Sequence, residues 1–181
     1  MNAVRRFAKE EQGTSLIEMM IAMVVLTVGL LSAMALPMVA VSGNSRNRWD
    51  STGTILAEMV VNQISSIPLG TSVTITDCAG NSQIINSAAS STGAGANLGT
   101  GSIDFTQSFS SITTGYSMMY TVCGASTGTR SVYDVRWNVQ TIRANSTNFV
   151  TVSSRIGSWN GRPQLFAIPI SLRTVVGNAG I

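Results

Sequence analysis

The chain has 181 residues, of which 44% are hydrophobic and only 10% are charged. This balance is unusual for a free soluble enzyme and indicates one very apolar segment joined to a polar, mostly uncharged remainder. The chain has no histidine and only two cysteines, which removes the commonest general base and rules out a four-cysteine zinc site. We therefore expect no enzymatic activity, no catalytic residue, no metal site and no cofactor.

The net charge is +3, and the basic residues are scattered along the chain. Eight arginines lie between Arg46 and Arg173, and no two of them are adjacent. Proteins that bind nucleic acid usually carry their basic residues in a stripe or cluster, so we do not expect nucleic acid as a partner.

The N-terminus joins a basic start to a long apolar stretch. Arg5, Arg6 and Lys9 come first, and no charged residue occurs from Met19 to Val41. As a helix these residues would extend about 35 Å, which is enough to cross a bilayer core of about 30 Å. The positive residues before the stretch predict a cytoplasmic N-terminus.

Three interpretations of this stretch compete. It can be a cleaved secretory signal with Ala33-Met34-Ala35 as the cleavage site, although the apolar run continues to Val41. It can be a plain single-pass anchor. It can also be a specialised export and assembly signal, for which the residues Gly13 to Glu18 (Gly-Thr-Ser-Leu-Ile-Glu) are the evidence.

The Gly13 to Glu18 segment and the apolar run after it resemble the class III signal of type IV pilins and of the pseudopilins of type II secretion. The resemblance implies a prepilin leader peptide over residues 1–13, cut by a prepilin peptidase between Gly13 and Thr14. It also implies N-methylation of Thr14 and a glutamate at the fifth mature position, which is Glu18. Thr14 departs from the family pattern, in which the first mature residue is most often phenylalanine.

Glu18 has two compatible interpretations. Ser15-Leu16-Ile17-Glu18 is a capping-box pattern at a helix start, and an acidic residue in the first turn suits the helix dipole. The resemblance adds a partner, since Glu18 would pair with the free amine at Thr14 of a neighbouring subunit in a filament.

One helix is predicted from about Thr14 to Ile64. Its first part, residues 14–41, is the transmembrane or filament-core segment, and Pro37 within it predicts a kink or local melting. Residues 42–66 form an amphipathic half. The apolar positions of this half recur at helical spacing: Ile55, Leu56, Met59, Val60 and Ile64.

The remainder, residues 67–181, is predicted to be a globular antiparallel sheet. Strands are expected at 71–77, 117–123, 131–142, 147–154 and 165–175, and a Gly/Ser-rich surface loop at about 79–101. In the third strand Tyr133, Val135, Trp137 and Val139 should lie on one, apolar face, and Asp134, Arg136, Asn138 and Gln140 on the other. In the last strand Phe166, Ile168, Ile170 and Leu172 should face inward, and Pro169 favours a sheet edge or a bulge.

A sheet with one apolar face needs a cover, and the amphipathic half of the helix supplies it. The predicted fold class is therefore α+β, with the apolar half of the helix protruding, which also matches the pilin architecture. Cys78 and Cys123 flank the loop. A disulfide between them would stabilise an extracytoplasmic domain by about 4 kcal/mol, and the alternative is two unpaired buried thiols.

The strand Tyr-Asp-Val-Arg-Trp-Asn-Val at 133–139 resembles the sheet strands of minor pilins of the pilus-modification type. With the Ser-Leu-Ile-Glu start at 15–18 and the apolar run ending in Leu36-Pro37, this resemblance makes a structural subunit of a type IV pilus, a minor pilin, the leading functional hypothesis. A type II secretion pseudopilin is the nearest alternative, and a membrane-anchored periplasmic binding protein or adhesin is a different class. The expected partners are prepilin peptidase, other pilin or pseudopilin subunits and an inner-membrane assembly platform. The expected location is the inner membrane before assembly, and the pilus, cell surface or periplasmic pseudopilus afterwards.

Overall fold

The computed structural model describes residues 15–125, 128–143, 147–164 and 167–177. The chain divides into two compact units, Met1–Ser45 and Arg46–Ile181. The elements in chain order are α1 Leu16–Ser66, β1 Ser72–Thr76, β2 Ser82–Asn86, β3 Ala94–Gly95, β4 Leu98–Gly99, β5 Ser102–Ile103, the 3-10 turn η1 Phe109–Ser111, β6 Ser117–Cys123, β7 Arg130–Arg143, β8 Thr147–Trp159, β9 Arg162–Pro163 and β10 Ile170–Gly177. The fold is α+β and pilin-like, as predicted.

The helix α1 spans 51 residues and ends before Pro68, within two residues of the predicted bounds. Helical residues continue through Pro37, so the local melting expected there is absent, and the kink stays a prediction. Proline at this position removes one N–H donor from the helix. Gly13 and Thr14 lie outside the described residues.

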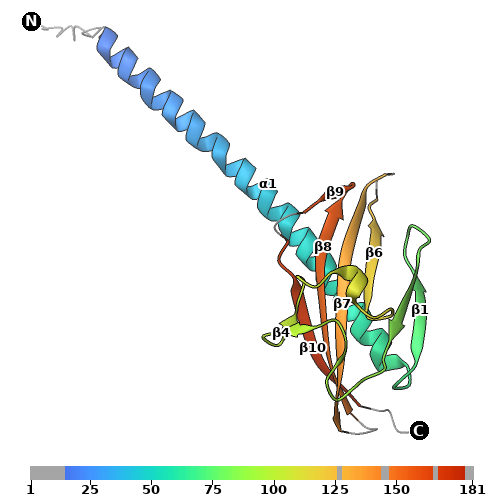
Figure 1. Cartoon of the computed structure of the whole chain (residues 1–181). Coiled ribbons are helices and arrows are strands. Elements are labelled where there is room, and N and C mark those ends of the chain that lie inside the picture. Colours follow the sequence, from blue (N-terminus) through green and yellow to red (C-terminus); the bar gives the residue numbers. More distant parts are fainter. Residues whose placement is uncertain (1–14, 126–127, 144–146, 165–166, 178–181) are drawn as a thin grey trace, which may run out of the picture. The chain divides into compact units, whose positions relative to one another are not determined.

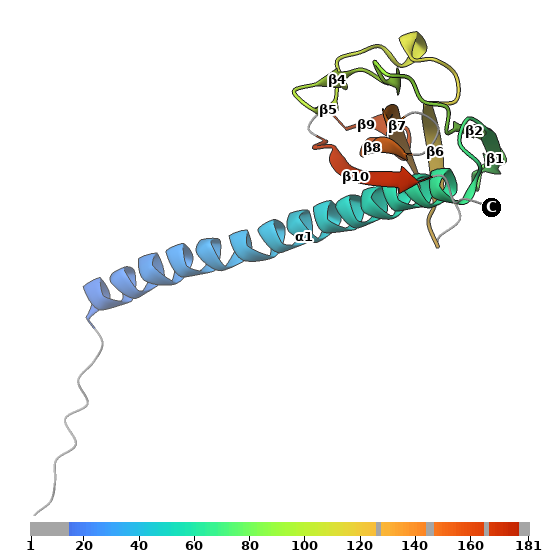
Figure 2. The same ribbon diagram turned by 90° about the horizontal axis from the view of Figure 1, so that it is seen from below.

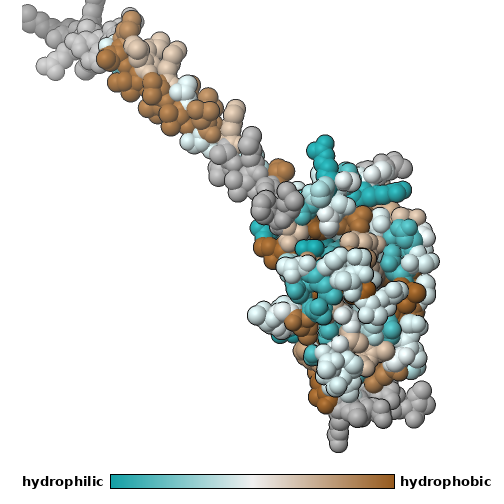
Figure 3. All heavy atoms as spheres, viewed as in Figure 1, coloured by the Kyte–Doolittle hydropathy of each residue, from teal (hydrophilic) through white to brown (hydrophobic). Residues whose placement is uncertain are grey.

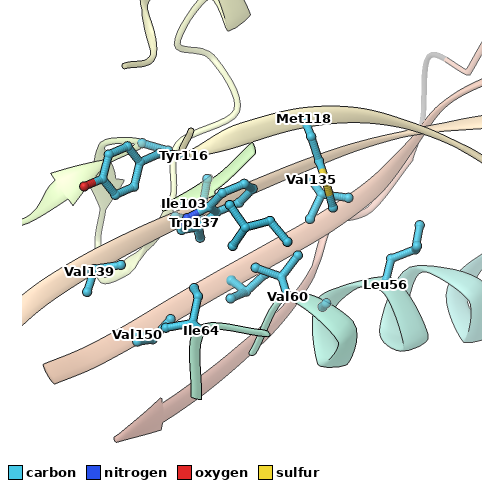
Figure 4. Packing of buried hydrophobic residues seen from close by; sticks show 14 of the residues in the cluster. Leu56, Val60, Ile64, Ile103, Tyr116, Met118, Val135, Trp137, Val139 and Val150 are labelled. Carbon is cyan, nitrogen blue, oxygen red and sulfur yellow. The ribbon is translucent and has the colours of Figure 1, made fainter. Parts of the chain in front are cut away.

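The part of α1 that belongs to the second unit packs on one face of the sheet. Leu56, Ala57, Val60 and Ile64 are buried at helical spacing, as the amphipathic pattern predicts. Figure 4 shows Leu56, Val60 and Ile64 on the side of the helix that faces the sheet. The prediction for Ile55 was wrong, because Ile55 lies outside this row and is 63% exposed.

Four strands form the body of the main sheet, and all their pairings are antiparallel (Figure 1). The long strands β7 and β8 lie at its centre, β10 pairs with β8, and β6 and β3 pair with β7. On the face toward α1, Tyr133, Val135, Trp137 and Val139 are at most 1% exposed, so this half of the predicted alternation is confirmed.

The opposite face of β7 carries the polar residues of the alternation, but it is covered rather than solvated. Asp134, Arg136 and Asn138 are buried and Gln140 is half-buried, because the segment from β3 to η1 covers them. The second unit therefore has three layers, with the helix, the sheet and this irregular cover in that order (Figure 2).

The predicted surface loop at 79–101 is also corrected. It contains β2, which forms a hairpin with β1 and buries Ile85, and the short strands β3 and β4. Gly95 has a positive φ of 108°, and a Cβ there would clash with the carbonyl oxygen of Trp137. Gly95 therefore allows this segment to pack closely against β7, and the segment is not an open loop there.

The last strand begins later than predicted. β10 starts at Ile170, while Ile168 lies before it and is 63% exposed, so the inward assignment of Ile168 was wrong. Ile170 and Leu172 are half-buried, and Leu172 packs against the core. β10 occupies an edge of the sheet as Pro169 suggested, and Phe166 lies outside the described residues.

Cys78 and Cys123 form a disulfide that joins the end of the β1 region to the end of β6. Asp77 reinforces this junction, since its carboxylate accepts hydrogen bonds from the backbone N–H groups of Ala79, Asn81 and Thr121 and from the Asn81 amide. Burial raises the pKa of Asp77, but the hydrogen bonds from Asn81 and Thr121 outweigh it and lower the pKa from 3.8 to about 2. The stability that Asp77 adds is therefore present above pH 3.8 and is lost as the pH falls through about 2.

Replacing Cys123 by serine should lower the free energy of unfolding by about 4 kcal/mol, because the disulfide closes a loop with a sequence separation of 45 residues. Such a loss corresponds to a thermal midpoint lower by roughly 8–16 °C for a domain of this size. Thermal unfolding of both proteins, with and without a reductant, is the measurement. A reductant should lower the midpoint of the wild-type protein and leave that of the variant unchanged. Equal midpoints under oxidising conditions would contradict a stabilising disulfide.

Candidate functional site

The N-terminal part of α1 exposes an apolar surface that the described residues do not cover. Residues Leu16–Met34 are long and apolar enough to cross a membrane, and none of this stretch is buried within the protein. Thirteen of its large hydrophobic side chains are 54–78% exposed, and Figure 3 shows the apolar colouring along this segment. Soluble monomers rarely expose a contiguous apolar surface of this kind, so this helix requires a membrane or other chains around it.

Glu18 lies in the first turn of α1. The N–H groups of Glu18 and Met19 donate to the carbonyl oxygen of Ser15, at 2.9 and 3.2 Å, which makes Ser15 the residue that starts the helix. Within the described part of the chain, neither the Ser15 hydroxyl nor the Glu18 carboxylate makes a side-chain hydrogen bond. The reciprocal bonds of a capping box are therefore not formed, and the exposed carboxylate is available to a group outside the described residues.

The remaining predicted site residues belong to other parts of the chain. Pro37 lies further along α1, and the disulfide Cys78–Cys123 belongs to the second unit. In the described ranges, no three Cys, Asp or Glu side chains lie close enough together to hold a metal ion.

Sequence reasoning missed a buried ion-pair network on the covered face of the sheet. The Asp134 carboxylate accepts from Arg136 Nε at 2.8 Å and Nη2 at 2.9 Å, and from Arg155 Nη2 at 3.2 Å. The Asp134 and Arg136 side chains are each 3% exposed. Two arginines thus share one carboxylate, and the second, Arg155, is partly exposed.

The network also holds the covering segment. Arg136 Nη1 donates to the carbonyl oxygen of Gln107 at 2.8 Å, and its guanidinium lies 4.8 Å from the Phe105 ring centroid. Arg155 lies 4.3 Å from the same ring. The signal in the sequence was an Asp–Arg pair two residues apart on one strand, which places both side chains on the same face. The Asp134–Arg136–Arg155 network has a packing role and lies in the second unit, whereas the apolar segment and Glu18 lie in the first.

Comparison with protein families identifies the prokaryotic N-terminal methylation motif at residues 9–34. The matched range includes Gly13, Thr14, Glu18 and the whole exposed apolar stretch. Comparison with curated proteins and with solved structures finds no match.

Proposed function

Since the methylation motif marks type IV pilin-like and pseudopilin-like proteins, we propose that this chain is a minor pilin of a type IV pilus. One observation supports assembly through the N-terminus above all others. The exposed apolar surface of Leu16–Met34 carries one carboxylate, Glu18, which makes no side-chain bond to the described residues.

The proposed sequence of events begins with insertion into the inner membrane, with the N-terminus in the cytoplasm. The peptidase then hydrolyses the peptide bond between Gly13 and Thr14, which releases the basic leader and creates an amine at Thr14. This amine is the proposed site of N-methylation and keeps its positive charge. Removal of the leader leaves Glu18 as the one charged side chain between Thr14 and Val41.

Assembly follows from the chemistry of the trimmed helix. Bundling of apolar helices covers the side chains that are exposed in the single chain, and burial of apolar area contributes roughly 25 cal/mol per Å². An unpaired carboxylate inside such a bundle would oppose assembly by several kcal/mol. Pairing of Glu18 with the Thr14 amine of a neighbouring subunit removes that penalty and fixes the stagger between adjacent subunits.

The second unit would then face solvent. The face of this unit seen in Figure 3 is mostly hydrophilic or neutral, and its disulfide suits an oxidising compartment. The strand Tyr133–Val139, which resembles the sheet strands of minor pilins, favours this subtype over the pseudopilin of a type II secretion system. Domain boundaries at 13/14, 41/42 and 66/67 remain part of the proposal.

The test is the location of the full chain in cells that possess both a type IV pilus and a type II secretion system. Filaments sheared from the cell surface should contain the chain and its co-purifying pilin subunits. Recovery with secretion pseudopilins, and absence from sheared pili, would replace the minor-pilin assignment by the pseudopilin alternative. Recovery only as an unassembled membrane protein, in cells with active peptidase, would favour an anchored binding protein.

A further inference from the structure

Two tryptophans and four arginines gather at one end of the second unit, and we call this surface the Arg–Trp end. It consists of Arg46, Arg48, Trp49, Arg130, Trp159 and Arg162. The rings of Trp49 and Trp159 lie 6.2 Å apart between centroids, so the start of the second unit's helix meets the end of β8. The Tyr133 hydroxyl donates to the carbonyl oxygen of Trp49 at 3.3 Å and fastens this turn of α1 to the sheet.

The strand register places Arg162 directly beside Trp159, and Arg130 lies across from the next residue, Asn160. Trp159 pairs with Arg162 of β9 on one side and with Ser131 of β7 on the other. The N–H of Arg130 donates to the side chain of Asn160 at 2.9 Å, so Arg130 lies at the same end. Figure 1 shows β9 beside the end of β8. These residues are far apart in the sequence, which is why the arginines looked scattered there.

The Arg–Trp end is exposed and has an excess of positive charge. All four arginines are exposed and Trp159 is 42% exposed. Among the ion pairs of the described residues, one involves these arginines: Arg46 Nε lies 4.0 Å from the Asp50 carboxylate, with side chains 60% and 49% exposed. A pair this exposed neutralises little, and Arg48, Arg130 and Arg162 have no carboxylate partner in the described part of the chain.

The chain enters the second unit at this surface. The uncharged run ends at Val41, and only the four residues 42–45 separate it from Arg46. If the apolar segment lies in a bilayer, the connection keeps Arg46, Arg48 and Trp49 close to the lipid headgroups. Tryptophan favours this interfacial depth, and the arginine fork binds phosphate oxygens in pairs.

We infer that the Arg–Trp end binds the anionic phospholipid surface of the membrane that holds the apolar segment. This inference rests on the membrane insertion in the proposed function. It assigns to the second unit a resting state on the bilayer, with the Trp159 ring at headgroup depth and Arg130 and Arg162 on phosphate groups. Extraction into a filament would break these contacts.

The test uses the full, uncleaved chain in vesicles of phosphatidylcholine, with or without phosphatidylglycerol, whose acyl chains carry bromine near the headgroup. Bromine quenches tryptophan fluorescence on contact. The chain has three tryptophans, and Trp137 is fully buried in the core, so it serves as an internal reference. Quenching should be stronger in the vesicles that contain phosphatidylglycerol, and Trp159→Phe should remove most of this excess.

The double variant Arg130→Gln/Arg162→Gln should lose the phosphatidylglycerol-dependent part of the quenching. Arg173→Gln is the matched control, because Arg173 is exposed but pairs with Thr151, which lies eight residues from Trp159 along β8. This control variant should retain the phosphatidylglycerol-dependent quenching. Equal quenching in both vesicles, or an unchanged excess in the double variant, overturns the inference while the chain stays inserted. If alkaline carbonate extracts the chain from the vesicles, the chain is not anchored in the membrane, and this result overturns both the anchoring and the inference.

Discussion

Replacing Asp134 by alanine is expected to destabilise the second unit by about 3–5 kcal/mol, because Arg136 would be left buried without its carboxylate. Asp134 and Arg136 are each 3% exposed, and the pair is joined by two hydrogen bonds of 2.8 and 2.9 Å. Arg136 also holds the cover segment through Gln107 and Phe105, so the loss should spread to that layer. Urea unfolding followed by tryptophan fluorescence, to which the buried Trp137 contributes, measures the change.

The chain supplies a matched control for this prediction. Asp50 pairs with Arg46 on the exposed surface at 4.0 Å, and Asp50→Ala should cost no more than about 1 kcal/mol. The double variant Asp134→Leu/Arg136→Met removes both charges together and should recover most of the loss. If Asp134→Ala costs as little as Asp50→Ala, the Asp134–Arg136–Arg155 network does not hold the covering layer.

Replacing Glu18 by alanine should leave membrane insertion intact and lower incorporation into filaments at least about tenfold. The apolar stretch remains long enough to span without Glu18. In the filament, the Thr14 amine of a neighbour would lose its partner, and an unpaired buried charge costs about 3–5 kcal/mol. Since about 1.4 kcal/mol changes an equilibrium constant tenfold, this cost is enough for the expected loss of incorporation. The ratio of the chain in sheared filaments to the chain in membranes is the measurement.

Two further variants separate charge from shape at this position. Glu18→Gln keeps the size of the side chain and removes the charge, so it should be almost as defective as Glu18→Ala. Glu58→Ala is the control on the same helix, since Glu58 is an exposed glutamate of the second unit, and it should assemble normally. Normal incorporation of Glu18→Gln would count against an ion pair between subunits.

The sequence predicts well those elements whose pattern is long and regular. The bounds of α1 follow from the apolar run, the helical spacing of Leu56, Val60 and Ile64, and the stop at Pro68. The inner face of β7 follows from a period of two over seven residues. Glu18, at the start of the candidate assembly segment, is identified because a glycine, a glutamate and an apolar helix occur at fixed spacing.

The features that the sequence does not predict depend on contacts between residues far apart in the chain. The segment from β3 to η1 has few apolar residues and no helical or strand periodicity. Its sequence therefore does not predict that it covers Asp134 and Arg136. The strand β2 is five residues long and depends on its hairpin partner β1. The Arg–Trp end is assembled from three separate parts of the chain, and only the β7–β8–β9 pairing brings Arg162 to Trp159 and Arg130 to the neighbouring Asn160.

The central claim is that the chain is a prepilin cut after Gly13, and the N-terminus of the protein tests it most directly. The chain should be expressed with and without a prepilin peptidase and its N-terminus determined by mass spectrometry. We expect an N-terminus at Thr14, N-methylated, only when the peptidase is present, and we expect Gly13→Val to abolish the cut. An N-terminus near Leu36 would indicate a secretory signal. An intact Met1 in the presence of active peptidase would indicate a plain anchor. Either result would contradict the claim.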